Sequence, residues 1–169
     1  IIHNKIVIEP AQWAPLRASA AQRIRAARSR KKNTMAVLTI GDQFPAYELT
    51  GVVPGKLADI EATKPEDYFT TVSSEGLDED TWRVVFFWPK DFTFVCPTEI
   101  AAFGKLADEF EARDTQVIGV SVDNEYTHYA WRRSHEELLD LPIVMASDLK
   151  RELTAALGIL NMDGVADRA

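Results

Sequence analysis

A single cysteine, Cys96, stands between a strand-like run and a predicted helix. Residues 84–88 are apolar and rich in β-branched and aromatic side chains, which is typical of a buried strand that ends at Pro89. Pro97 and the helical spacing of the apolar residues after it predict a helix that begins beside Cys96. Unpaired N–H groups and the dipole at a helix N-terminus favour negative charge. The sequence therefore predicts a thiol that ionises near neutral pH and acts as a nucleophile.

The alternative is a structural cysteine. A lone cysteine is more often a small buried hydrophobe, and Val95 beside Cys96 fits that interpretation. Thr93 favours chemistry, because its hydroxyl could donate a hydrogen bond to a thiolate and then to an incoming oxygen. On local chemistry alone, both interpretations stay open.

A longer stretch around Cys96 carries a family resemblance. Pro89, Thr93 and Cys96 stand in the Pro-x-x-x-Thr-x-x-Cys arrangement of peroxiredoxins. The string FFWPKDFTFVCPTEIAAF resembles the typical two-cysteine peroxiredoxins, especially the peroxidase subunit of bacterial alkyl hydroperoxide reductase. Further similar stretches occur at 120–131 and at 147–148, so that the resemblance runs from about residue 35 to residue 169.

The resemblance implies a thiol peroxidase that reduces hydrogen peroxide and organic hydroperoxides, with Cys96 cycling through sulfenic acid. Thr93 would hydrogen-bond the sulfur and the peroxide, and Pro89 would shield the pocket. Arg168 would stabilise the thiolate and the developing charge, and Glu99 would orient Arg168 through an ion pair. No metal and no cofactor are implied. Each residue also has a plainer interpretation, as a loop hydroxyl, a first-turn acid or a surface arginine.

The resemblance further implies an α/β protein with a thioredoxin-like fold, in its peroxiredoxin variant. Two parallel strands joined by a helix would place Cys96 at the carboxyl edge of the sheet, where ligand crevices form in open α/β sheets. Trp82, Trp88 and Trp131 are expected in the core. The pattern predicts strands at 46–50, 68–72, 83–88, 116–123 and 142–146, helices at 97–113, 124–139 and 149–157, and a hairpin around 163–164.

Composition limits the other classes of function. The 169 residues are 46% hydrophobic and 27% charged, which is typical of a globular domain, and no run is long enough to span a membrane. One cysteine excludes an internal disulfide framework and favours the cytoplasm. His3, His128 and His135 are scattered, without zinc-ligand spacing. Residues 35–169 hold 11 basic and 25 acidic side chains, which argues against nucleic-acid binding.

Residues 1–34 differ from the rest, with 8 Lys/Arg and one acid. They fit a basic tail that touches nucleic acid or lipid, a transit peptide, or sequence outside the natural subunit. We favour the last, because Met35 begins a stretch that resembles a peroxiredoxin start. We expect 1–34 to be mostly disordered, with a short helix near 18–30, and 35–169 to form the catalytic domain.

The resemblance also implies a C-terminally truncated subunit, because typical members carry a resolving cysteine beyond the hairpin. The expected partners are a hydroperoxide, a thioredoxin-like or dithiol adaptor reductant, and other copies of the subunit in a homodimer or ring. A non-catalytic alternative is an inert fragment, or a holdase-like or oligomer-associating protein. A cysteine hydrolase would need His128 as its base.

Overall fold

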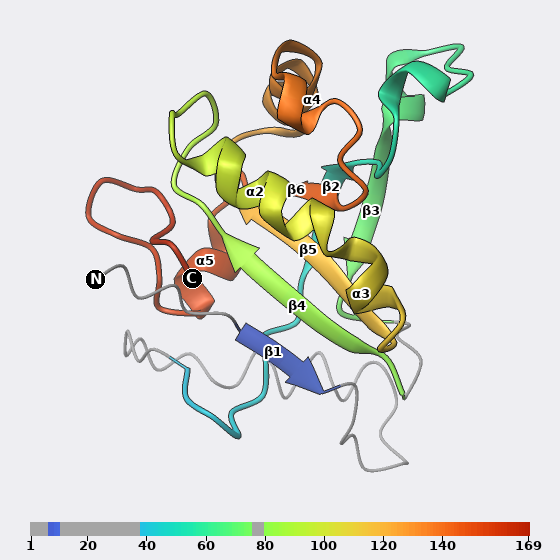
Figure 1. The fold of residues 1–169 in the computed structure, drawn as a ribbon. Coiled ribbons are helices and arrows are strands. Elements are labelled where there is room, and N and C mark those ends of the chain that lie inside the picture. Colours follow the sequence, from blue (N-terminus) through green and yellow to red (C-terminus); the bar gives the residue numbers. More distant parts are fainter. Residues whose placement is uncertain (1–6, 11–37, 76–79) are drawn as a thin grey trace.

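The computed structural model describes residues 7–10, 38–75 and 80–169 (Figure 1). Within them, six strands form one mixed sheet in the order β1-β4-β5-β6-β2-β3. The strands are β1 (Val7–Pro10), β2 (Glu48–Val52), β3 (Phe69–Ser73), β4 (Trp82–Phe87), β5 (Thr115–Ser121) and β6 (Val144–Ser147). The α-helices are α2 (Cys96–Lys105), α3 (Ala107–Glu111), α4 (Glu125–Ser134) and α5 (Glu152–Ala156).

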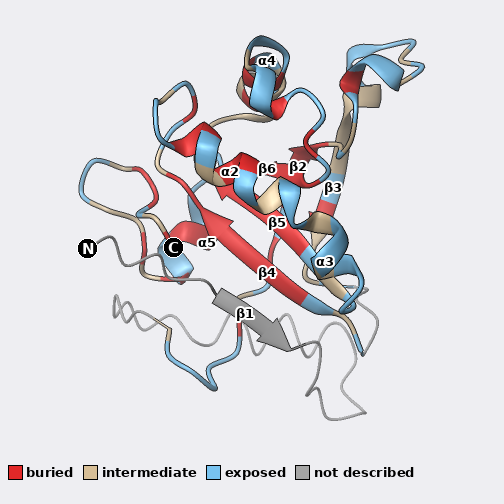
Figure 2. Ribbon diagram, viewed as in Figure 1, coloured by how far each residue is buried: buried red, intermediate tan, exposed pale blue. Residues whose placement is uncertain are grey.

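The centre of the sheet is parallel. β4 pairs with β5 and β5 with β6 in parallel, while β1 and β2 join their neighbours antiparallel. Because α2 and α3 connect β4 to β5, the loop after β4 and the start of α2 lie at the carboxyl edge of the parallel strands, as predicted. Figure 2 shows that β4 and β5 are buried along most of their length.

The side chains of β4 alternate between two cores, as a strand covered on both faces requires. Val85 and Phe87 pack with Leu153 and Leu157 at α5 on one face of the sheet. The other core holds Val84, Phe86, Trp88, Cys96, Ile100, Trp131 and Leu138, which places α2 and α4 over that face. Cys96 is therefore part of a helix-covered core rather than of an open surface.

Gly119 on β5 makes room for the aromatic residues beside the candidate site. A Cβ atom at this position would lie 2.7 Å from the Phe86 ring and 2.8 Å from the Trp88 ring. Phe86 also stacks on Phe103 of α2, with ring centroids 4.1 Å apart. The absent side chain thus lets the end of β4 and the start of α2 pack closely on the sheet.

Three predicted helices are shorter in the structure. The helix expected at 97–113 breaks at Leu106 into α2 and α3, shortly after Gly104, a residue with low helix propensity. The helix expected at 124–139 ends at Ser134, and a separate 3-10 turn follows at Glu136–Leu138. The third helix, α5, begins only after Arg151, because the left-handed φ of 58° at Arg151 does not fit a right-handed helix.

Two smaller predictions also need correction. The hairpin around residues 163–164 forms a turn with Gly164 at φ 75°, but its arms make only one isolated bridge, between Leu160 and Ala166. Trp82 is 46% exposed rather than buried, since it begins β4 at the rim of the sheet. Trp88 and Trp131 are in the core, as predicted.

Within the described residues, the basic segment 1–34 contributes a strand that was not predicted. Val7–Pro10 form β1, which pairs antiparallel with β4 at the edge of the sheet. The rest of the segment, including the helix expected near 18–30, lies outside the described residues.

Candidate active site

Cys96 is the first residue of α2 and is buried, with 1% of its surface exposed. It is a free cysteine. Arg168 reaches it from the far end of the chain, and its Nη2 donates a hydrogen bond to Cys96 Sγ over 3.2 Å. A guanidinium at this distance favours the anionic form of the sulfur.

Glu99 completes this charged group. It lies in the first turn of α2, and its Oε2 is 3.0 Å from Nε of Arg168 in an ion pair. The hydrogen bond to the Cys96 sulfur raises the pKa of Arg168 above its ordinary value, and the charges of Cys96 and Glu99 add to the rise. The guanidinium therefore stays charged while it faces both the sulfur and the carboxylate. A cavity of about 40 Å³ adjoins Glu99 and Arg168.

The N-terminus of α2 adds a second source of positive potential. The N-cap residue Val95 makes no side-chain hydrogen bond to the N–H groups of the first turn. The Thr98 hydroxyl turns away from them and donates to the Val95 carbonyl over 2.9 Å. Cys96 thus stands at the positive end of α2 and also contacts Arg168.

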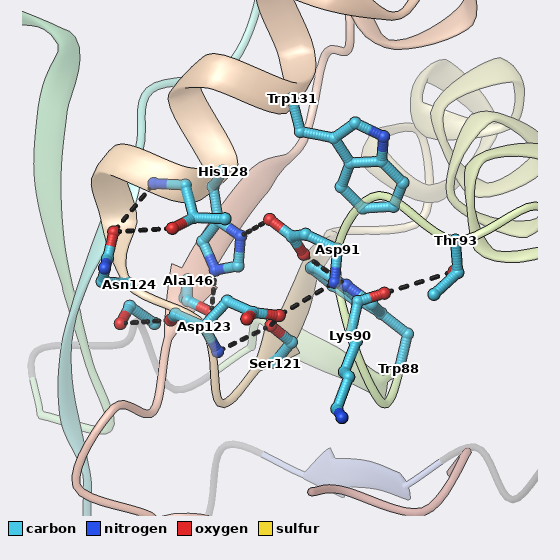
Figure 3. A network of polar contacts seen from close by, with 12 residues as sticks. Trp88, Lys90, Asp91, Thr93, Ser121, Asp123, Asn124, His128, Trp131 and Ala146 are labelled. Carbon is cyan, nitrogen blue, oxygen red and sulfur yellow. Dashed lines mark hydrogen bonds and ion pairs between the residues drawn. The ribbon is translucent and has the colours of Figure 1, made fainter.

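The structure places Thr93 differently from the expectation. Its hydroxyl donates to the Lys90 carbonyl over 3.2 Å (Figure 3). Among the described residues, no hydrogen bond joins the Thr93 hydroxyl to Cys96. Pro89 is partly exposed and lies two residues after the end of β4. Cys96, Arg168 and Glu99 are therefore brought into contact, whereas Thr93 and Pro89 lie on the preceding loop without a direct bond to the sulfur.

A buried polar network at the start of this loop escaped the sequence analysis. The Asp91 carboxylate accepts a hydrogen bond from Trp88 Nε1 over 2.7 Å and lies 2.6 Å from Nδ1 of His128 on α4 (Figure 3). In the sequence, Asp91 was only one letter of the family string, and His128 was one of three scattered histidines and the base that a hydrolase would need. Neither signal distinguishes a network from ordinary packing.

The same network answers the hydrolase alternative. The two ring nitrogens of His128 face Asp91 and the Ala146 carbonyl, at 2.6 and 3.2 Å. His128 is thus engaged away from Cys96. Among the described residues, no group of three or more His, Cys, Asp or Glu side chains could hold a metal ion.

Comparison with known proteins gives this geometry its context. Residues 40–169 match the AhpC/TSA family. The chain belongs to this family. It is 67% identical over 135 residues to alkyl hydroperoxide reductase C of Mycolicibacterium smegmatis, and the matched stretch covers 80% of this chain and 69% of that protein. It is 62% identical over 134 residues to alkyl hydroperoxide reductase C of Mycobacterium tuberculosis H37Rv, over 79% of this chain and 68% of that protein.

Solved structures agree with the sequence comparison. Mycobacterium tuberculosis AhpC superposes with a TM-score of 0.74 at 62% identity, over 79% of this chain and 78% of that one. A Plasmodium vivax two-cysteine peroxiredoxin in its reduced state superposes with a TM-score of 0.66 at 27% identity, over 78% of this chain and 64% of that one. The predicted peroxiredoxin resemblance and the thioredoxin-like α/β fold are confirmed. AhpC/TSA membership and relatives named as reductases also do not favour the inert or holdase-like alternative.

Proposed function

We propose that this AhpC/TSA chain is a thiol peroxidase that reduces hydroperoxides through Cys96. The observation that carries the proposal is the contact of Arg168 with the Cys96 sulfur at the N-terminus of α2, with Glu99 paired to the same guanidinium. Relatives named alkyl hydroperoxide reductase C at 67% and 62% identity support the same chemistry.

The reaction follows from the charge at this site. The Cys96 thiolate attacks one oxygen of the peroxide, a sulfur–oxygen bond forms and the O–O bond breaks. Cysteine is oxidised to sulfenic acid, and the second oxygen leaves as an alkoxide or hydroxide that takes up a proton to become an alcohol or water. Arg168 holds the thiolate and then the charge that develops on the leaving oxygen, and Glu99 keeps Arg168 oriented.

The loop residues have supporting roles in this proposal. Thr93 would leave the Lys90 carbonyl and donate its hydroxyl proton in a hydrogen bond to the bound peroxide. Pro89 would keep water away from the reacting oxygens, because it has no N–H group to attract a solvent molecule. Both roles rest on the family resemblance, and both residues lie on the loop that precedes Cys96.

Completion of the cycle requires a reductant. Cys96 is the one cysteine of these 169 residues, so the thiol that reduces the sulfenic acid lies outside them. We propose a thioredoxin-like or dithiol adaptor protein for this step, a homodimer or ring as the assembly, and the cytoplasm as the location. Among the described residues no helix has both the length and the hydropathy of a membrane span. We further propose that residues 35–169 are the catalytic domain and that 1–34 are an extension to it.

A trapping experiment tests the proposed function. The chain is treated with a stoichiometric amount of cumene hydroperoxide in the presence of dimedone, and the adduct is located by mass spectrometry. We expect a sulfenic acid adduct at Cys96 together with loss of the peroxide. Cys96→Ser, with an unchanged melting temperature, should consume peroxide at least about a thousandfold more slowly. A parent chain that forms no adduct and leaves the peroxide intact would refute the proposal.

A further inference from the structure

The loop between β4 and α2 is held at its start by a carboxylate that lies inside the protein. The Asp91 side chain is 1% exposed and that of His128 is fully buried. Asp91 Oδ1 accepts from Trp88 Nε1 over 2.7 Å, and its Oδ2 lies 2.6 Å from His128 Nδ1 (Figure 3). The backbone N–H of Asp91 donates to Asp123 Oδ2 over 2.8 Å. Elements far apart in the sequence thus converge on one residue of the loop.

The contacts of the imidazole fix how many protons the pair holds. His128 Nε2 lies 3.2 Å from the Ala146 carbonyl, which can only accept, so Nε2 carries a proton. Nδ1 and the Asp91 carboxyl are 2.6 Å apart, and two lone pairs at that distance would repel, so a second proton lies between them. Carboxyl and imidazole together therefore hold two protons and carry no net charge, which suits their full burial.

The rest of the loop is held less firmly. Phe92, next to Asp91, has a left-handed φ of 55° and is mostly exposed apart from a contact of its ring with Trp131, and Phe94 is fully exposed. Strain of this kind in a residue other than glycine persists only where neighbouring contacts impose it. The Asp91 network supplies such contacts immediately before Phe92, and Cys96 follows the exposed part of the loop.

We propose that Asp91 and His128 are positioning residues for the Cys96 reaction, and that their shared proton keeps the catalytic loop closed over the sulfur. The proposal rests on the proposed function and adds residues that do not touch the reacting atoms. Opening of the loop would expose Cys96 to solvent and loosen its contact with Arg168. The network therefore sets both the rate of the first chemical step and the accessibility of the thiol.

A pair of substitutions at Asp91 separates hydrogen bonding from bulk stability. Asp91→Ala removes both side-chain bonds. Asp91→Asn can keep every bond, because its oxygen accepts from Trp88, its amide donates to a neutral imidazole, and Nε2 of His128 still donates to the Ala146 carbonyl. Should Asp91→Ala fail to fold, His128→Gln replaces it, since an amide near the Nε2 position can still donate to Ala146 while the bond to Asp91 is lost.

Three measurements are made on each variant: the rate of Cys96 oxidation by cumene hydroperoxide, the rate of Cys96 alkylation by iodoacetamide under native conditions, and the melting temperature. We expect Asp91→Ala or His128→Gln to oxidise about tenfold to a hundredfold more slowly, because misplacement by a fraction of an ångström to one ångström has that effect. Alkylation by the small reagent should become faster. Asp91→Asn should stay within about threefold of the parent in both rates, as a variant with all its hydrogen bonds kept.

Two outcomes would overturn the inference. One is a variant with a broken network whose melting temperature falls while both rates at Cys96 stay at the parental value, because that result would assign the network a purely structural role. The other is an Asp91→Asn variant that loses as much activity as Asp91→Ala. Failure of the proposed function is distinguishable, because in that case the parent chain itself does not react with the peroxide.

Discussion

The start and the middle of the loop between β4 and α2 are held in different ways. At its start, Trp88 and Asp91 are buried, and Asp91 bonds to Trp88, to His128 on α4 and to Asp123 after β5. In its middle, Phe92 and Phe94 are 57% and 100% exposed, and Thr93 bonds only within the loop, to Lys90, among the described residues. We infer that the buried groups fix the position of the sulfur, while the exposed middle of the loop is the part that the substrate approaches.

The residues beyond the loop continue this contrast. Cys96 is buried at the start of α2, while its charged partners Arg168 and Glu99 have side chains that are 27% and 28% exposed. Water therefore reaches the charges and weakens each pairwise interaction. We expect these groups to matter more for the rate of the reaction than for the stability of the fold.

Among the residues around the sulfur, the largest effect should follow from removal of the Arg168 guanidinium. Arg168→Met keeps the length of the side chain but loses the hydrogen bond to the Cys96 sulfur, and oxidation by peroxide should slow about a hundredfold. Stopped-flow oxidation with hydrogen peroxide measures the rate. Arg168→Lys is the matched control: it keeps the charge without the forked geometry and should fall between the two. Equal rates in all three chains would mean that Arg168 has no part in the reaction.

A smaller effect should come from the middle of the loop. Thr93→Val removes the hydroxyl that is expected to reach the peroxide, and oxidation should slow about tenfold, as for the loss of one hydrogen bond that strengthens in the transition state. Thr93→Ser keeps the hydroxyl and should react at nearly the parental rate. If the valine variant matches the serine variant, Thr93 serves only its bond to Lys90.

A lesser change is expected at the partner of the guanidinium. Glu99→Gln replaces the ion pair with a neutral contact, so that Arg168 is less well oriented, and oxidation should slow about threefold. The effect should shrink in high salt, because salt already screens a pair that is partly exposed. Parallel measurements in low and high salt check this, and a loss as large as that of Arg168→Met would contradict the assigned order.

The smallest effect should be that of Pro89→Ala. Pro89 is partly exposed and is not bonded to the sulfur, so the oxidation rate should fall by no more than about twofold, with a modest loss of stability from a freer unfolded chain. A melting curve and the same stopped-flow assay separate these two consequences. A tenfold loss of rate would instead assign Pro89 a direct place in the chemistry.

Much of this architecture could be predicted from the sequence. The apolar run before Pro89 and the proline after Cys96 define a buried strand and a helix start, because both signals are local. Arg168 and Glu99 were named only through the family resemblance, since no local pattern links residues so distant in the chain. The bond between Asp91 and His128 could not be predicted, because it depends on how α4 packs over the sheet.

The boundaries of the helices were the least predictable feature. Apolar spacing continues through Leu106 and through Leu149, where the structure has a break and a turn. At α5 a local side-chain contact fixes the start of the helix, because Asp148 accepts from the backbone N–H groups of Leu153 and Thr154. The spacing of apolar residues indicates which side chains are buried, but it does not indicate at which residue a helix ends.

The central claim is that Arg168, bonded to the sulfur at the N-terminus of α2, makes Cys96 the nucleophile of the reaction. The most direct test is the time course of dimedone labelling at Cys96 after addition of hydrogen peroxide, in the parent chain and in Arg168→Met, with Cys96→Ser as the blank. We predict that the adduct forms far faster in the parent chain than in Arg168→Met. Equal time courses in the two chains would contradict the account.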